Sequence, residues 1–233
     1  DVLGSRGLGD VYKRQIHDRT NGKDGIYITY EEDNPISFNP FYTESGKFDV
    51  EKRDSINTLI LTLWKREDES PKRSEEVALS GAVNAYIRKI SENRNIRPDF
   101  NGFYEFVADD YRRMIEEKKV REKDFDIDGF LNVLEPFYRG GDYDFLLNSD
   151  KELDLTGKRF IVFELDNISS NKVLLPVVTL IIMETFIAKM RRLKGIRKMI
   201  LIEECWKALM SANMSEYIKS VSYTHLRAHE TLR

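Results

Sequence analysis

The sequence predicts an α/β fold in which a crossover helix joins parallel strands and the chain carries a mostly helical insertion. Three observations support this. Residues 25–30, GIYITY, alternate and are rich in β-formers. Residues 50–139 carry apolar side chains at helical spacing. Residues 158–203 then run from one short apolar stretch through a long apolar helix to a second short apolar stretch.

Composition identifies a globular chain. The 233 residues are 41% hydrophobic and 33% charged with a net charge of −3, which excludes a disordered chain and a basic nucleic-acid coat. The single cysteine, Cys205, excludes an internal disulfide and every multi-cysteine metal site. The most apolar stretch, residues 173–188, is shorter than the ~20 residues of a membrane span and contains Pro176 and Glu184, so it predicts a buried helix.

Both ends of the chain are excluded from the fold prediction. Residues 10–15, DVYKRQ, and 221–233, VSYTHLRAHETLR, resemble translated sequencing-adapter read-through, so we expect 1–15 and 221–233 to be artefacts. The glycine-rich stretch at residues 4–9 lies in this part and is followed by Asp10. Because no lysine–hydroxyl pair follows it, we do not predict a phosphate-binding loop there.

Four helices are predicted between the strand at 25–30 and the later apolar runs. The first spans residues 50–64, Pro71 lies in the first turn of the second, the third covers residues 102–119, and Asp128 caps the fourth. The predicted buried stripes of the second and fourth helices comprise Val77, Leu79, Ala82, Val83, Tyr86, Ile87 and Ile90, and Phe130, Leu131, Val133, Leu134 and Phe137.

The region after residue 150 predicts a βαβ unit. Residues 158–165 form a near-continuous apolar run, a helix over residues 173–193 ends near Gly195, and residues 198–203 form a second buried strand. Two strands joined through such a helix lie parallel with a right-handed crossover.

Acidic residues lie at both predicted strand ends. In an open parallel sheet, ligands bind beyond the carboxyl ends of the strands, where Glu164 and the pair Glu203–Glu204 fall. Four apolar residues followed by two acids is the Walker B pattern of P-loop nucleotidases, in which the first acid anchors hydrated Mg²⁺ and the second polarises the attacking water. The alternative is that Glu203 and Glu204 flank the following helix near its N-terminus, where acids are favourable.

Other polar residues carry weaker predictions. Glu164, with Asp166 beyond it, lacks an adjacent second acid and is interpreted as a neighbour of the site or a cap. Trp206 is expected to pack and Cys205 to be an inert core residue. A basic cluster fits contact with phosphates or a membrane surface, or favourable charge at a helix C-terminus. This cluster consists of Lys189, Arg191, Arg192, Lys194, Arg197 and Lys198.

Several segments together resemble one family. They are GIYITYEEDNPISFNPF, DIDGFLNVLEPFYRGGDYDFLLNSD, RFIVFELDNI, LLPVVTLIIMETFIAKMRRLKG and RKMILIEECWKALMSANMSEYIKS. In this order and spacing, over residues 16–220, they resemble the TraG-type ATPases of conjugative transposons, relatives of the large type IV secretion ATPases. The resemblance implies a partial RecA-like P-loop ATPase core, with its start at 16–49, a helical insertion at 50–150, and core with Walker B at 151–220.

The resemblance also implies site residues and cofactors. Glu203 matches the Mg²⁺-associated acid, Glu204 the catalytic acid, and Trp206 and Lys207 the tail of the same motif. Many relatives have aspartate where Glu203 stands. The full-length parent is expected to use ATP and Mg²⁺. The phosphate loop is expected upstream and the glutamine- and arginine-bearing elements downstream, so this chain is expected to be an internal fragment that neither binds nor hydrolyses ATP by itself.

The function implied by the resemblance is coupling of ATP hydrolysis to assembly of, or transport through, a conjugative apparatus. Its expected setting is a hexamer or partner-bound assembly in the cytoplasm, peripheral at the inner face of the cytoplasmic membrane, with DNA contact left open. The alternative is a non-catalytic scaffold that recruits other apparatus proteins. Under that alternative, Phe103, Phe106 and Tyr111 are the candidate interface residues, whereas their helical spacing favours a stripe that packs in the core.

Overall fold

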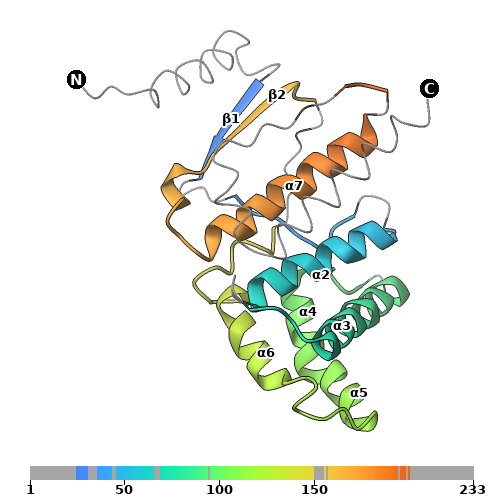
Figure 1. The fold of residues 1–233 in the computed structure, drawn as a ribbon. Helices are drawn as coiled ribbons and strands as arrows, with labels where there is room; N and C mark the ends of the chain where they lie inside the picture. Colours follow the sequence, from blue (N-terminus) through green and yellow to red (C-terminus); the bar gives the residue numbers. More distant parts are fainter. Residues whose placement is uncertain are drawn as a thin grey trace, which may run out of the picture. The chain divides into compact units, whose positions relative to one another are not determined.

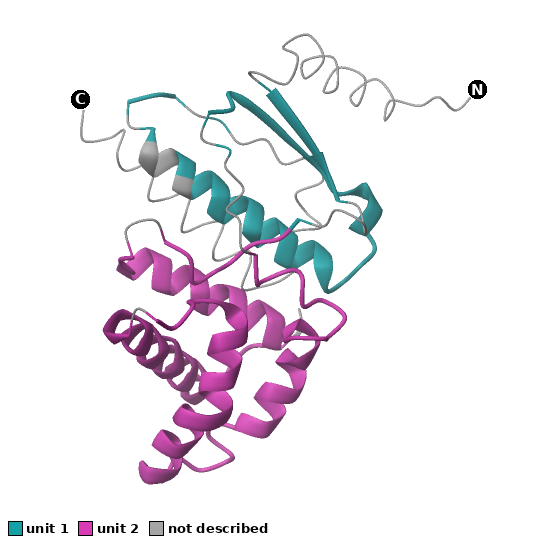
Figure 2. Cartoon of the chain, turned by 180° about the vertical axis from the view of Figure 1, so that it is seen from behind, with its two compact units in different colours: residues 1–36, 153–201 teal, residues 37–152, 202–233 magenta. Residues whose placement is uncertain are grey.

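The computed structural model divides the chain into two compact units (Figures 1 and 2). We call the described residues of 25–36 and 155–199 the strand unit, and those of 37–149 the helical unit. The structure describes residues 25–30, 36–43, 46–65, 69–93, 95–149, 155, 157–193, 195–197 and 199.

The strand unit contains two strands, β1 (Gly25–Thr29) and β2 (Phe160–Glu164). They pair in parallel, in a register that runs from Gly25 opposite Phe160 to Thr29 opposite Glu164. The strands predicted at 25–30 and 158–165 are therefore confirmed. Their pairing with each other was not predicted, because periodicity within one segment carries no information about its partner.

Helix α7 (Leu174–Arg192) follows β2 through the short 3₁₀ turn η3 (Asp166–Ile168). It confirms the helix predicted at 173–193. The side-chain oxygen of Asn171 accepts hydrogen bonds from the backbone N–H of Val173 and Leu174, which satisfies donors at the start of the helix. Gly195, at φ +76°, follows its C-terminal end in the left-handed conformation that glycine favours.

Helix α7 is buried on several sides, as predicted for the stretch at 173–188. An apolar helix of this kind belongs in a protein core. Among the described residues, the structure contains no helix that is both long and apolar enough to span a membrane. The buried apolar side chains of α7 are Leu174, Val177, Val178, Leu180, Ile181, Met183 and Ile187.

The second strand of the predicted βαβ unit, at 198–203, lies outside the described residues except for Met199. Met199 is 86% exposed and belongs to no strand. The βαβ prediction for this segment therefore stays a prediction.

The helical unit consists of helices that pack against one another (Figure 1). Its elements follow one another along a continuous stretch of chain. They are α2 (Val50–Trp64), α3 (Arg73–Glu92), α4 (Phe100–Phe106), the π-helix η1 (Val107–Tyr111), α5 (Arg112–Glu117), α6 (Ile127–Leu134) and the 3₁₀ turn η2 (Glu135–Phe137).

Aspartate side chains begin three of these helices. Asp49 accepts a hydrogen bond from the backbone N–H of Lys52 at 2.8 Å, which starts α2 at the predicted residue. Asp126 accepts a hydrogen bond from the backbone N–H of Gly129 at 2.9 Å and is the N-cap of α6. The prediction that Asp128 caps the fourth helix was therefore wrong. Asp128 lies in the first turn of α6, and its carboxylate pairs with Arg112 instead.

The second and third predicted helices also begin elsewhere than expected. Helix α3 starts at Arg73, because the carboxylate of Glu75 accepts a hydrogen bond from the backbone N–H of Lys72 at 2.7 Å. Pro71 thus precedes the helix and does not lie in its first turn. The third helix starts at Phe100, behind the N-cap Asp99, and includes the π segment η1.

An aromatic cluster fills the middle of the helical unit. Phe41, Tyr86 and Phe103 have ring centroids 4.9 to 5.7 Å apart, and all three are almost completely buried. Phe106 and Tyr111 are also buried, at 3% and 5% exposure. This confirms that Phe103, Phe106 and Tyr111 pack in the core, as expected for a stripe at helical spacing, and it contradicts the alternative in which their rings form an interface.

Two members of the predicted stripes are exposed. Val77 is 65% exposed, because it lies two residues before the buried Leu79, which on a helix is a rotation of about 200°. Val133 is 40% exposed, next to the fully buried Leu134. The other predicted stripe residues are buried.

The two ends of the helical unit lie side by side. The backbone N–H of Phe38 donates to the carbonyl oxygen of Leu146 at 2.9 Å, and that of Ser149 donates to the carbonyl oxygen of Phe38 at 3.3 Å. The hydroxyl of Ser37 donates to the carbonyl oxygen of Phe145 at 2.6 Å. The segments that begin and end this unit are therefore joined by hydrogen bonds.

Candidate functional site

The carboxyl ends of β1 and β2 lie at the same edge, because the strands are parallel (Figure 1). The register also sorts their side chains into two faces. One face is wholly apolar. The other is polar at its carboxyl end, with Tyr27 beside Val162 and Thr29 opposite Glu164. The apolar face comprises Ile26, Ile28, Ile161 and Phe163.

Glu164 is the last residue of β2 and is half-buried. Its Oε2 accepts a hydrogen bond of 3.0 Å from the hydroxyl of Tyr27, 137 residues away in the sequence. Tyr27 lies two positions earlier on the same face of the neighbouring strand, a diagonal that a long aromatic side chain can bridge. The carboxylate is therefore held in place at the carboxyl edge.

The chain beyond both strands is tied together. The backbone N–H of Tyr30 donates to the carbonyl oxygen of Glu164 at 3.3 Å. The side-chain amide of Asn167 donates to the carbonyl oxygen of Tyr30 at 3.0 Å. These bonds extend the strand pairing past the edge and give the carboxylate of Glu164 a fixed backbone frame.

Lys189 connects α7 to the opposite, amino end of β2. Its ammonium donates to the carbonyl oxygen of Leu155 at 2.8 Å and to that of Lys158. Helix α7 therefore runs back along β2, as a crossover helix does. The first residue of the predicted basic cluster thus binds backbone carbonyls of its own unit. Arg197, another member, is exposed.

The predicted catalytic and metal-binding acids, Glu204 and Glu203, lie outside the described residues. The same holds for Cys205, Trp206 and Lys207, and for the glycine-rich stretch at 4–9. Their roles stay predictions. Of the acidic residues predicted at strand ends, Glu164 is the one that lies among the described residues. The interpretation of Glu164 as a neighbour or cap missed its hydrogen bond from Tyr27, which no local pattern in the sequence signals.

The described residues contain no cluster of three or more possible metal-ligating side chains. This is compatible with Mg²⁺ bound to a nucleotide, because Mg²⁺ in such sites takes most of its ligands from phosphates and water and only one or two from carboxylates. Glu164 is a carboxylate in the position where such a donor fits, at the carboxyl edge of a parallel strand pair.

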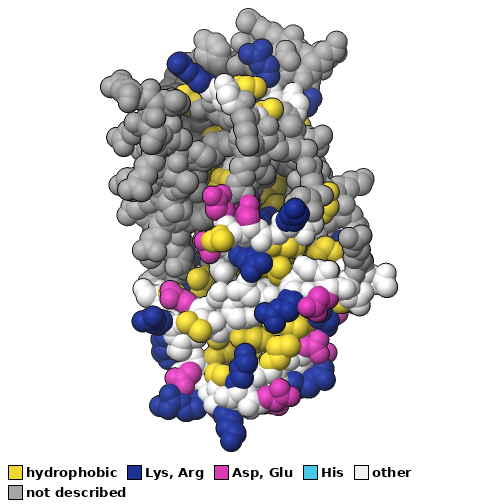
Figure 3. Space-filling view, turned by 90° about the vertical axis from the view of Figure 1, so that its right-hand side faces the viewer, with side chains coloured by type: hydrophobic (Ala, Val, Ile, Leu, Met, Phe, Trp, Pro, Cys, Tyr) yellow, Lys and Arg dark blue, Asp and Glu magenta, His cyan; other side chains and the backbone are white. Residues whose placement is uncertain are grey.

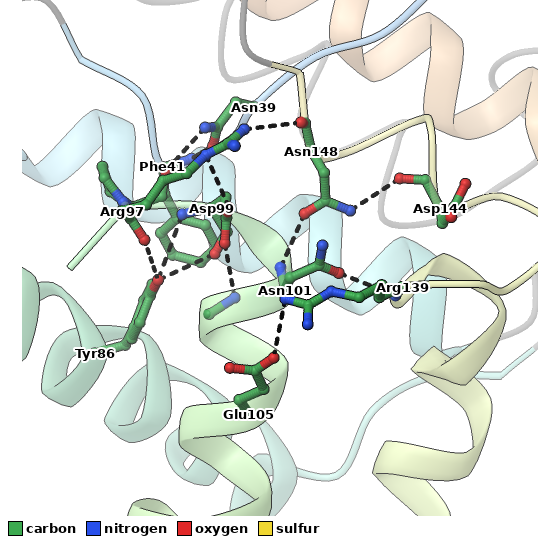
Figure 4. A network of polar contacts seen from close by, with 12 residues as sticks. Asn39, Phe41, Tyr86, Arg97, Asp99, Asn101, Glu105, Arg139, Asp144 and Asn148 are labelled. Atoms are coloured by element: carbon green, nitrogen blue, oxygen red, sulfur yellow. Dashed lines mark hydrogen bonds and ion pairs between the residues drawn. The ribbon is translucent and has the colours of Figure 1, made fainter.

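A second polar network lies in the helical unit at the start of α4 (Figure 4). The Asp99 carboxylate accepts a hydrogen bond from the backbone N–H of Gly102 and pairs with Arg97. The Tyr86 hydroxyl donates to the backbone carbonyl oxygen of Asp99. Burial raises the pKa of the Tyr86 phenol, so that group stays neutral. Asn148 bonds the start of α4 to the loop that closes the unit. These groups satisfy one another, so we interpret the network as structural.

On the described part of one face, neither sign of charge forms a continuous surface (Figure 3). In its lower part, Lys and Arg side chains alternate with Asp and Glu, and hydrophobic groups lie between them. A phosphate-binding surface requires an excess of positive charge. The described side chains of this face therefore do not form such a surface.

A family model described as the TraG P-loop domain matches residues 6–231. The match covers both units and Glu203–Glu204, and it extends into the two end segments that resemble adapter sequence. A search of the curated proteins finds no match.

Proposed function

We propose, from the premise that the chain belongs to the TraG P-loop domain family, that its protein couples ATP hydrolysis to assembly of, or transport through, a conjugative apparatus. Family membership makes it a protein related to the TraG-type conjugation ATPases. The observation that carries the proposal is the family match across both units. The parallel strands with an acid at their carboxyl edge add support, because this is where P-loop proteins of the α/β class bind ligands.

Within this proposal, Glu204 is the catalytic acid. Its carboxylate accepts a proton or hydrogen bond from the water that attacks the terminal phosphate. Glu203, its neighbour on the chain, is the acid associated with Mg²⁺, through water. Successive residues at a strand end point in different directions, so the two carboxylates can take separate roles.

ATP and Mg²⁺ are the cofactors of the proposed reaction. When bound, Mg²⁺ neutralises charge on the phosphates. The chain's own contribution is a set of carboxylates at the carboxyl edge of its sheet. Glu164 is the one among the described residues, and the pair Glu203–Glu204 is proposed for the next strand.

The proposed setting is a hexameric or partner-bound assembly with other proteins of the conjugative apparatus, peripheral at the inner face of the cytoplasmic membrane. This part of the proposal rests on the family resemblance. The alternative of a non-catalytic scaffold has lost its candidate interface, since Phe103, Phe106 and Tyr111 are buried.

The test uses the full-length protein and compares ATP turnover with ATP binding. We expect Glu204→Gln to abolish turnover and to leave ATP binding intact, because the amide keeps the size of the side chain and loses its basicity. Glu203→Gln should weaken Mg²⁺-dependent nucleotide binding. Glu117→Gln, an exposed acid at the end of α5, is the control and should leave both unchanged. Undiminished turnover in Glu204→Gln would reject the assignment.

A further inference from the structure

We propose that Glu164 is an additional carboxylate of the nucleotide site and that Tyr27 is its positioning residue. In this arrangement, Glu164 accepts hydrogen bonds from water molecules around the Mg²⁺–nucleotide, and the Tyr27 hydroxyl holds the carboxylate in the orientation that permits this. The inference rests on the proposed function, since it assigns residues to the same nucleotide site.

The position of Glu164 follows from the strand register. Because β1 and β2 are parallel and Thr29 pairs with Glu164, the carboxylate belongs to the last pair of the ladder. Ligands of open parallel sheets bind directly beyond this end. The side chain lies on the polar face of the pair, with Tyr27 and Thr29, and not on the apolar face that contains Phe163.

The hydrogen bond from Tyr27 uses only part of what the carboxylate can accept. A carboxylate has two oxygens and about four acceptor positions. The Tyr27 hydroxyl occupies one position on Oε2, and within the described part of the chain Oε1 accepts no hydrogen bond from a side chain or backbone group. Glu164 is half-buried, so water can still reach it.

A merely structural role would be to latch β1 to β2. The strands already have a ladder of five paired residues, which the Tyr30 and Asn167 bonds extend. A latch also needs no charge, because the amide oxygen of glutamine accepts the same hydrogen bond from Tyr27. The two roles therefore predict different results for Glu164→Gln.

The experiment measures, in the full-length protein, the Mg²⁺ concentration at half-maximal binding of a fluorescent ATP analogue, beside steady-state turnover. We expect Glu164→Gln to raise this concentration about tenfold, the size of effect seen when groups that orient metal ligands are removed. Tyr27→Phe keeps the ring and the charge on Glu164, so we expect a smaller rise, of about threefold. The double variant should match Glu164→Gln alone, because Tyr27 acts through Glu164.

Asp166→Asn is the matched control. It removes the same charge two residues beyond Glu164, from an exposed side chain outside the strand, and should leave the Mg²⁺ dependence unchanged. Circular dichroism and thermal unfolding check that each variant is folded. A Glu164→Gln variant that is folded and has the wild-type Mg²⁺ dependence would overturn the inference.

The outcomes separate this inference from the proposed function. If the wild-type protein hydrolyses ATP and Glu204→Gln does not, the function stands, and the Glu164 and Tyr27 variants alone decide the inference. If the wild-type protein shows no Mg²⁺-dependent nucleotide binding, the proposed function itself fails, and the inference fails with it. Equal effects of Glu164→Gln and Asp166→Asn would indicate general loss of negative charge and would also overturn the specific role of Glu164.

Discussion

The helical unit is built from one continuous stretch of chain, whereas the strand unit is assembled from two stretches that the helical unit separates. In the helical unit, most contacts form between helices that are neighbours in sequence, such as α2 with α3. In the strand unit, the main pairing joins β1 to β2, and the Tyr27–Glu164 bond spans 137 residues. In the helical unit, the polar interactions are ones that we interpret as structural. The proposed nucleotide chemistry lies in the strand unit, where segments far apart in the sequence meet.

The two units also use polar groups differently. In the helical unit, polar side chains cap helices and satisfy one another, as in the network around Asp99. In the strand unit, Glu164 is fixed by one hydrogen bond at an edge where ligands bind in related folds. Mutations that affect one unit and spare the other are therefore the direct test of this comparison.

The largest expected effect comes from Phe41→Ala in the helical unit. Phe41 is fully buried against the rings of Tyr86 and Phe103, so its loss leaves a cavity. We expect the free energy of unfolding to fall by about 3–5 kcal/mol in urea titrations. Tyr42→Ala, at a side chain that is 45% exposed, should change it by no more than about 0.5 kcal/mol. Hydrogen exchange should show loss of protection in α3 and α4 with β1 and β2 unchanged; equal loss in both units would contradict their separation.

The corresponding change in the strand unit is Lys189→Met. It removes the ammonium that binds the carbonyl oxygens of Leu155 and Lys158 and leaves these acceptors without that donor. We expect a loss of about 1–3 kcal/mol, with faster hydrogen exchange in β2 and α7 and normal exchange in the helical unit. Lys118→Met, at an exposed lysine after α5, is the control. An unchanged exchange rate in β2 would show that the Lys189 contact does not stabilise the strand unit.

A smaller effect distinguishes two aspartates of one helix. Asp126→Ala removes the N-cap of α6 and should cost about 1 kcal/mol. Asp128→Ala removes an exposed partner of Arg112, and because surface pairs contribute little, its effect on thermal unfolding should be the smaller of the two. The reverse order would restore Asp128 as the cap.

The smallest expected effect is a gain in stability. Lys119 has φ 55°, and the backbone N–H of Val120 bonds to the carbonyl oxygen of Ile115, a C-terminal motif that glycine favours. Lys119→Gly should therefore raise the free energy of unfolding by about 0.5–1 kcal/mol, because it relieves the left-handed conformation. Lys118→Gly, one residue earlier in right-handed conformation, should lower it instead. A loss of stability in Lys119→Gly would contradict this account.

Local sequence pattern predicted most elements of both units. The bounds of α2 were right to the residue because Asp49 precedes a clear apolar stripe. The N-cap of α6 was wrong because Asp126 and Asp128 both precede apolar residues, and only the backbone path decides which carboxylate reaches a free N–H. The predicted burial of Val77 was wrong because Val77 was assigned to the stripe for its hydrophobicity alone, although it lies on the other side of α3 from the buried Leu79.

The sequence by itself determined the two described strands, most of the described α-helices, the aromatic core of the helical unit and the acid at the end of β2, since these depend on side-chain chemistry and on spacing over a few residues. Its assignment of Glu203 and Glu204 to the nucleotide site awaits the turnover experiment. Only the tertiary structure decided that β1 pairs with β2 and that Tyr27 binds Glu164. These facts depend on contacts between residues far apart in the chain, which periodicity within a segment does not specify.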